Sequence, residues 1–71
     1  MNKFIEFTSI YTGKAMQINI DEISSFYEDS VKLPNTSSLR NCTSIYMKNG
    51  NHHTVRENYN EVKEKINENN R

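Results

Sequence analysis

The strongest constraint on the fold of this chain comes from Asn49-Gly50, which lies between two alternating segments. Residues 43–48 and 51–56 each alternate apolar and polar side chains, as strands with one buried face do. Asn-Gly tolerates the positive φ angles of a two-residue type I′ turn better than most dipeptides. The pattern therefore predicts a tight hairpin between two antiparallel strands.

A helix over about residues 58–67 is predicted to follow this hairpin directly. Asn58 belongs to the residue types that cap helix N-termini, and Glu61 stands three positions later, as in a capping box. The apolar residues that recur at helical spacing are Tyr59, Val62 and Ile66. They form one narrow apolar stripe that is suited to pack against a sheet.

Three further strands are predicted before the hairpin, over about residues 3–8, 15–20 and 24–28. The first two are expected to pair, because Gly13 can form a turn between them. Residues 29–42 are rich in Ser and Asn and contain Pro34, so a long loop is predicted there. Long ordered loops in small domains are often functional.

Together these patterns predict a single α+β domain over residues 1–71: a small antiparallel β-sheet of four to five strands with one C-terminal α-helix packed on one face. Only 34% of the residues are hydrophobic, so the core is small for a stable domain. Small domains usually compensate with disulfides, metals or self-association. Cys42 has no partner cysteine, and no Cys/His cluster has zinc spacing. We therefore expect a homo-oligomer, a dimer or higher.

The charge balance narrows the choice of partners. Nine basic residues are balanced by nine acidic ones, which argues against nucleic acid as a partner. No apolar run approaches the roughly 20 residues of a membrane span, and the polar N-terminus does not look like a signal peptide. A cytoplasmic protein with no membrane attachment is expected.

The sequence shows no arrangement that is typical of an enzyme. His52 and His53 are adjacent on a predicted strand and point to opposite faces, so both cannot hold one ion. No nucleophile motif surrounds Cys42, and neither glycine belongs to a phosphate-binding loop. We predict a non-catalytic protein that uses no metal and no cofactor.

Tyr27 and Tyr46 are candidates for contact with a protein partner, on the sheet face that the helix leaves uncovered. Tyrosine buries a large area while keeping a polar tip, and it is enriched at interfaces. Lys32 and Arg40, in the predicted loop, would join this contact. Alternatively, Arg56 at the junction of strand and helix could bind a nucleotide phosphate together with Arg40, Lys32 and Tyr46. An ion pair between Arg56 and a nearby Glu is the structural alternative.

The order of motifs resembles small FlbD-like proteins of flagellar operons and short uncharacterised proteins of phages and mobile elements. The matching residues are Phe4-Ile5-Glu6-Phe7-Thr8, Gly13, Asn19-Ile20-Asp21-Glu22-Ile23, Asn49-Gly50, Val55-Arg56-Glu57 and Glu61-Val62. The resemblance implies a small antiparallel sheet with a helix and no known catalytic activity. It implies no ligand site.

Three functions are compatible with these observations. The first is a bacterial or phage interaction module that binds and modulates another protein, for example as an inhibitor of a host defence factor. The second is an oligomer that sequesters a small ligand such as a nucleotide. The third is an accessory role in flagellar assembly, which the resemblance implies.

Overall fold

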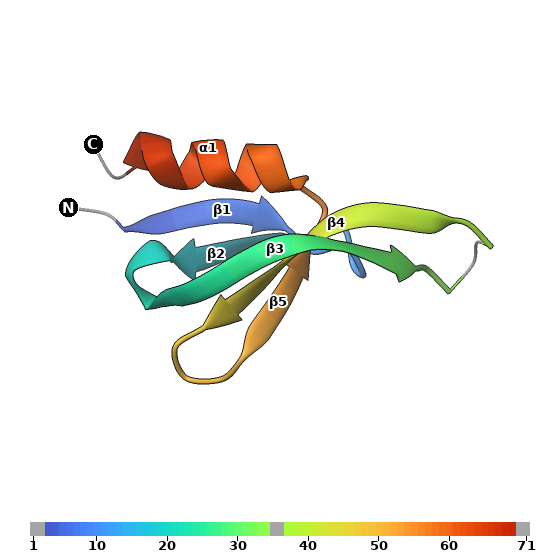
Figure 1. Ribbon diagram of the computed structural model, residues 1–71, viewed down its shortest axis with the longest axis horizontal. Coiled ribbons are helices and arrows are strands. Elements are labelled where there is room, and N and C mark those ends of the chain that lie inside the picture. Colours follow the sequence, from blue (N-terminus) through green and yellow to red (C-terminus); the bar gives the residue numbers. More distant parts are fainter. Residues whose placement is uncertain (1–2, 35–36, 70–71) are drawn as a thin grey trace.

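The computed structural model of the protein describes residues 3–34 and 37–69 (Figure 1). In order along the chain, its elements are β1 (Phe4–Thr8), β2 (Ala15–Asn19), the short 3₁₀ helix η1 (Ile20–Glu22), β3 (Ile23–Lys32), β4 (Leu39–Met47), β5 (His52–Val55) and α1 (Tyr59–Asn69). The α+β class and the C-terminal helix are therefore confirmed.

The strands form two antiparallel sheets, so the prediction of one sheet is wrong. β1 pairs with β2, while β3, β4 and β5 form a meander in that order. The two sheets meet at an isolated bridge between Ser9 and Val55, next to a backbone hydrogen bond of 2.7 Å from Arg56 N–H to the Thr8 carbonyl. Beyond this point β1 and β5 diverge, so their pairing does not continue as one sheet (Figure 1).

The long loop predicted over residues 29–42 is largely strand. β3 continues to Lys32 and β4 begins at Leu39, with Asp29 opposite Cys42 and Lys32 opposite Leu39. Most side chains of this part are exposed on both faces. Because only Cys42, at the base of this part, is buried, the residues do not alternate between apolar and polar, and the strand pattern is missing from the sequence.

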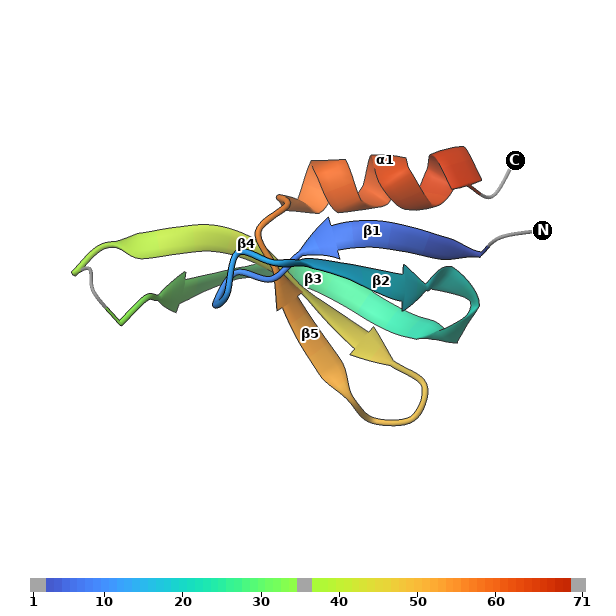
Figure 2. The same ribbon diagram turned by 180° about the vertical axis from the view of Figure 1, so that it is seen from behind.

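We call residues 29–32 and 39–42 the arm. This two-stranded part of the β3–β4 ribbon extends past the helix and past the other strands (Figure 1 and Figure 2). It contributes to the elongated form of the molecule, which measures 41 × 23 × 20 Å along its principal axes.

The turn between β4 and β5 is not the predicted type I′ turn. A type I′ turn needs a positive φ at both Asn49 and Gly50. Gly50 has a φ of 91°, but among the described residues only glycines have a positive φ, so Asn49 does not adopt the type I′ conformation. Met47 N–H donates to the Asn51 carbonyl at 2.8 Å, and Gly50 N–H donates to the Met47 carbonyl at 3.1 Å. These bonds close a three-residue loop in which only the last residue is left-handed, a common alternative to the two-residue turn.

The core lies between the two sheets and α1. Its buried members are Ile5, Phe7, Ile18, Ile20, Ile45, Val55 and Val62. The helix contacts β1, β3 and β4, so it packs against strands of both sheets. The helix thus helps to hold the two sheets together.

The start of α1 has the capping box that the sequence predicts. Asn58 Oδ1 accepts a hydrogen bond of 2.9 Å from Glu61 N–H, and Glu61 Oε1 accepts one of 3.3 Å from Asn58 N–H. Two backbone donors that a helix N-terminus leaves unpaired are satisfied in this way.

Candidate interaction surface

Three ring side chains stand in a row across β3, β4 and β5. The ring centroids of Tyr27 and Tyr46 are 5.5 Å apart with planes inclined by 13°, and those of Tyr46 and His52 are 5.3 Å apart with planes inclined by 21°. The separations are close to the spacing of neighbouring strands, so the rings stack side by side. We call Tyr27, Tyr46 and His52 the aromatic row.

The register of the sheet explains why the row forms. Tyr46 lies directly opposite His52 on β5. Tyr27 lies opposite Ser44, which precedes Tyr46 by two residues on β4. Opposed residues share a face of a sheet, and so do residues two positions apart on one strand. All three rings therefore project from the same face.

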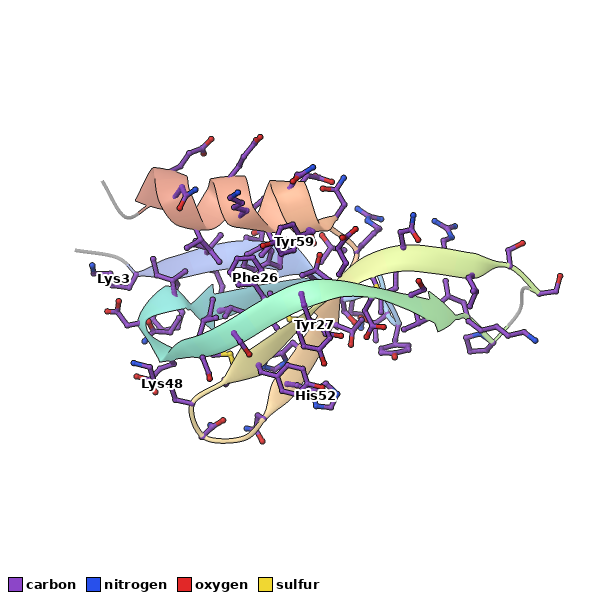
Figure 3. All side chains as sticks on the ribbon, in the orientation of Figure 1. Lys3, Phe26, Tyr27, Lys48, His52 and Tyr59 are labelled. Atoms are coloured by element: carbon purple, nitrogen blue, oxygen red, sulfur yellow. The ribbon has the colours of Figure 1, made fainter. Side chains whose placement is uncertain are left out.

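The helix covers the other face of β3. The Phe26 ring lies 5.4 Å from the Tyr59 ring of α1, with planes inclined by 35°. Figure 3 shows these two side chains on the helix side of β3, and Tyr27 and His52 on the opposite side. Tyr27 keeps 46% of its surface exposed, and His52 is exposed as well. The aromatic row thus faces away from the helix.

Polar groups around the row have shifted pKa values. Hydrogen bonds of 2.7 Å from Ser44 Oγ and of 2.8 Å from Ser30 N–H lower the pKa of the Asp29 carboxyl, with the Ser44 bond as the larger cause. A hydrogen bond with Tyr46 is the main cause that raises the pKa of the Tyr27 hydroxyl. Near neutral pH, an ionised carboxylate therefore stands two residues from a neutral phenol on the same face.

Lys32 and Arg40, which were predicted to join the tyrosines, lie in the arm. Lys32 lies opposite Leu39, and Arg40 is the residue after Leu39 on β4. The side chains of Lys32 and Arg40 therefore project from opposite faces of the ribbon. Arg40 precedes Tyr46 by six residues on β4, which corresponds to about 20 Å along the strand. The structure therefore brings Tyr27 and Tyr46 together but places Lys32 and Arg40 at a distance from them.

One protomer does not assemble the residues predicted for nucleotide binding, which are Lys32, Arg40, Tyr46 and Arg56. Arg56 follows the end of β5, whereas Tyr46 lies opposite His52 at its beginning. The four residue steps from His52 to Arg56 span about 13 Å of extended chain. A pocket between subunits would need a second protomer to supply part of this set.

His52 belongs to the aromatic row although sequence reasoning did not select it for partner contact. The cause is the turn: a two-residue turn at Asn49-Gly50 would place Tyr46 opposite His53. The observed three-residue loop shifts the register by one residue and places Tyr46 opposite His52. His53 consequently lies on the other face, opposite Ile45.

Two pockets border β3. A pocket of about 370 Å³ lies between the start of this strand and the helix, where Phe26, Tyr59 and Ile66 contribute to its lining. A second pocket of about 300 Å³ lies at the start of the arm, lined in part by Glu28 and Asn58. Neither pocket is lined by a residue predicted for partner or ligand binding.

The described residues show no arrangement of three or more His, Cys, Asp or Glu side chains that could hold a metal ion. The Cys42 side chain is 2% exposed, and burial, together with the charge of Asp29, raises the pKa of its thiol. A buried thiol with a raised pKa is a poor nucleophile.

Comparison with known proteins gives no relative. No family model matches the chain, and no similar protein was found among curated proteins or solved structures. Within residues 3–34 and 37–69, no helix combines the length and the apolar character needed to cross a membrane. The resemblance to FlbD-like proteins therefore rests on the sequence motifs alone.

Proposed function

We propose that this protein is a non-catalytic interaction module that binds and modulates another protein through the aromatic row. The observation that carries the proposal is the stacking of Tyr27, Tyr46 and His52 on the face that the helix does not cover. Aromatic side chains are over-represented among the residues that dominate binding energies at protein interfaces.

The stacking also favours binding on entropic grounds. Each ring of the row is restrained by at least one neighbouring ring at 5.3 to 5.5 Å. A side chain that is already ordered loses less conformational freedom when a partner binds. The row thus combines apolar surface, polar ring tips and limited mobility, which are properties of efficient contact residues.

The arm provides a second contact in this proposal. Leu39 is 69% exposed near its end, and the neighbouring cations are Arg40, next in sequence, and Lys32, directly opposite. Leu39 shares a face with Lys32, whereas Arg40 projects from the other face, so the Leu39 face suits a partner site that combines apolar surface with a carboxylate. Arg40 lies on the face of the aromatic row, about 20 Å from Tyr46 along β4, whereas Leu39 and Lys32 lie on the opposite face. One partner would therefore have to extend along the sheet and around the arm to contact them all.

The setting of the proposed interaction is the bacterial cytoplasm. The motifs shared with phage and flagellar-operon proteins support a bacterial or phage origin, and a phage protein of this kind would inhibit a host defence factor. A flagellar partner is the other possibility that the motifs suggest. The genes next to the coding sequence would distinguish the two settings.

The proposal is tested by affinity capture from bacterial lysate with single variants of the tagged chain. His52→Ser removes one end of the row, and Tyr27→Ser removes the other. The matched control is Tyr11→Ser, because Tyr11 is a 62% exposed tyrosine between β1 and β2, outside the row. We expect a protein that the unaltered chain and Tyr11→Ser retain and that both row variants lose.

The same capture tests the arm with Leu39→Ser and with the double variant Lys32→Ala/Arg40→Ala. Weaker capture by both supports the arm as a contact site, and unchanged capture limits the contact to the row. If all variants, including those in the row, retain the same proteins, the aromatic row is not the binding surface and the proposal is wrong.

A further inference from the structure

β3 is a long strand with a partner on one side only. Nine of its ten residues pair with β4, and no described strand pairs with its other edge. An edge strand with unpaired backbone groups can be extended by another strand. A register shift interrupts the pairing between Ile23 and Ser25, but from Ser25 to Lys32 it is regular. This regular part is the segment to which a second strand could add.

The aromatic row ends at this edge. Tyr27 stacks on Tyr46 with one ring face, and its other ring face has no aromatic neighbour among the described residues. Because the rings of the row are spaced like strands, an added strand that carried an aromatic residue opposite Tyr27 would continue the row. The chain itself contains such a strand, which is β3 of a second copy.

Symmetry limits the ways in which two copies of β3 can pair. Two identical edge strands pair in antiparallel fashion about a two-fold axis perpendicular to the sheet, and this axis keeps every side chain on its own face. Opposed residues lie on the same face of an antiparallel pair. Each possible axis therefore lies at one residue of β3, and that residue lies directly opposite its own equivalent in the other copy. The choice of that residue sets the whole register.

The carboxylates of β3 select among these registers. An axis at Glu28 or at Asp29 places two identical carboxylates directly opposite each other, which is destabilising. An axis at Ser30 pairs residues 28–32 but places Tyr27 opposite Leu33, beyond the end of β3, so it does not continue the aromatic row. An axis at Tyr27 pairs residues 25–29, which lie within the regular part, opposes no like charges and places the two Tyr27 rings side by side.

We propose that two copies of this protein form a dimer by antiparallel pairing of β3 about a two-fold axis at Tyr27. Ser25 of each copy then lies opposite Asp29 of the other, where a hydroxyl can donate to a carboxylate. The three-stranded sheets of the two copies become one six-stranded sheet. The two aromatic rows become one continuous row of six rings on one face.

This inference goes beyond the proposed function and does not depend on it. It names a second copy as the occupant of the β3 edge, whereas the protein partner was proposed to bind the row and the arm. A dimer would present two aromatic rows to a partner on the same side, and such a surface would suit a partner that is itself two-fold symmetric.

The first experiment uses a matched pair of substitutions at Ser25, which is exposed and lies opposite Asp29 only in the proposed register. Ser25→Asp opposes two pairs of like charges, and we expect it to weaken dimerisation about tenfold. Ser25→Lys opposes unlike charges, so the dimer should be retained or strengthened. The dimer dissociation constants are measured by analytical ultracentrifugation at low salt, together with circular dichroism to show that both variants fold.

The second experiment fixes the register by disulfide formation under mild air oxidation. Tyr27→Cys places two thiols at directly opposed positions, about 5 Å apart at Cβ. Glu28→Cys places them at offset positions, with Cα atoms more than about 7 Å apart, which is too far for a disulfide. Cys42 is buried and should not compete. We expect Tyr27→Cys to give covalent dimers much faster than Glu28→Cys.

A monomeric unaltered chain at high micromolar concentration would overturn the proposal, and so would equal effects of Ser25→Asp and Ser25→Lys. Faster cross-linking of Glu28→Cys would overturn the register at Tyr27. If the chain is monomeric but Ser25→Asp abolishes capture of a lysate protein, the edge binds a different chain and the second copy is the wrong occupant. His52→Ser, far from the edge, should leave the dimer intact, so the two proposals can fail independently.

Discussion

The backbone N–H of Thr8 donates a hydrogen bond of 3.0 Å to Oε1 of Glu57, although the two residues are 49 positions apart in sequence. The carbonyl of Glu57 also accepts a bond of 2.8 Å from the Thr43 hydroxyl, whose side chain is fully buried. Glu57 therefore ties the end of β1 and the middle of β4 to the segment that leads into α1. This place is next to the bridge at which the two sheets meet.

The bond between Thr8 and Glu57 predicts a stability loss that depends on the acceptor. Glu57→Ala leaves the part-buried Thr8 N–H without its partner and should lower the free energy of unfolding by about 1–3 kcal/mol. Glu57→Gln keeps an acceptor oxygen at the same position and should lose clearly less. Urea denaturation of the three proteins measures the difference. Equal losses in both variants would show that the carboxylate charge, and not the hydrogen bond, is what matters.

Gly13 predicts a purely conformational cost of substitution. Its φ is 72°, in the left-handed region, and a Cβ added there would have no atom within 4 Å. Gly13→Ala should therefore destabilise the protein by about 1 kcal/mol through backbone strain alone. Asn tolerates this region better than Ala, so Gly13→Asn should cost less. Thermal unfolding distinguishes the two, and an equal cost would mean that strain is not the cause.

The parts of the fold that depend on local interactions could be predicted from the sequence. The capping box joins residues three positions apart, and the β1–β2 hairpin needs only two alternating strands and a glycine between them. The division into two sheets depends instead on where β1 and β5 diverge after the bridge between Ser9 and Val55. No short sequence pattern indicates where two strands that are distant in sequence diverge.

The candidate surface was predicted in part, because it depends on register. Tyr27 and Tyr46 could be selected as aromatic residues of the uncovered face. His52 could not, since one additional residue in the loop after Met47 decides whether His52 or His53 lies opposite Tyr46. The arm was missed for another reason. Strands that are exposed on both faces have no apolar alternation by which to recognise them.

Substitutions at Ile45 are expected to remove a large share of the free energy of unfolding. Its side chain is fully buried in the cluster between sheets and helix. Ile45→Ala should cost about 2–5 kcal/mol and Ile45→Val about 0.5–1.5 kcal/mol. A domain of this size has a total stability near the lower end of about 5–15 kcal/mol. Ile45→Ala should therefore lose a large part of the total stability and lower the thermal midpoint, followed by circular dichroism, much more than Ile45→Val does. Equal midpoints of the two variants would contradict this.

The aromatic row predicts that the pKa of the Tyr27 hydroxyl depends on Tyr46. The hydrogen bond with Tyr46 is the main cause that raises the pKa of Tyr27 above its ordinary value of 10.0. Tyr46→Phe keeps the ring but removes the hydroxyl, so the pKa of Tyr27 should fall back toward that value. Ultraviolet difference titration of the phenolate measures it. The control is Tyr59→Phe, on the helix side of β3, which should leave Tyr27 unchanged.

Asp29 predicts a loss of stability in acid. Its pKa is lowered in the folded protein, mainly by the Ser44 hydroxyl. The resulting stabilisation is fully present above the unfolded-state pKa of about 3.9 and is lost as the pH falls through the lower folded-state pKa. Ser44→Ala removes the larger cause but keeps the bond from Ser30 N–H, so the pKa of Asp29 should rise while remaining somewhat below its ordinary value.

The Asp29 carboxyl can be followed directly by carbon-detected NMR titration of the unaltered chain and of Ser44→Ala. Ser25→Ala is the matched control, because Ser25 is a serine of the same face that does not contact Asp29 in the protomer. Its titration should equal that of the unaltered chain. An unchanged Asp29 pKa in Ser44→Ala would mean that the Ser44 hydroxyl does not hold the carboxylate. If Asp29 titrates differently in Ser25→Ala at concentrations where the protein self-associates, and normally on dilution, the carboxylate also receives the Ser25 hydroxyl of the second copy.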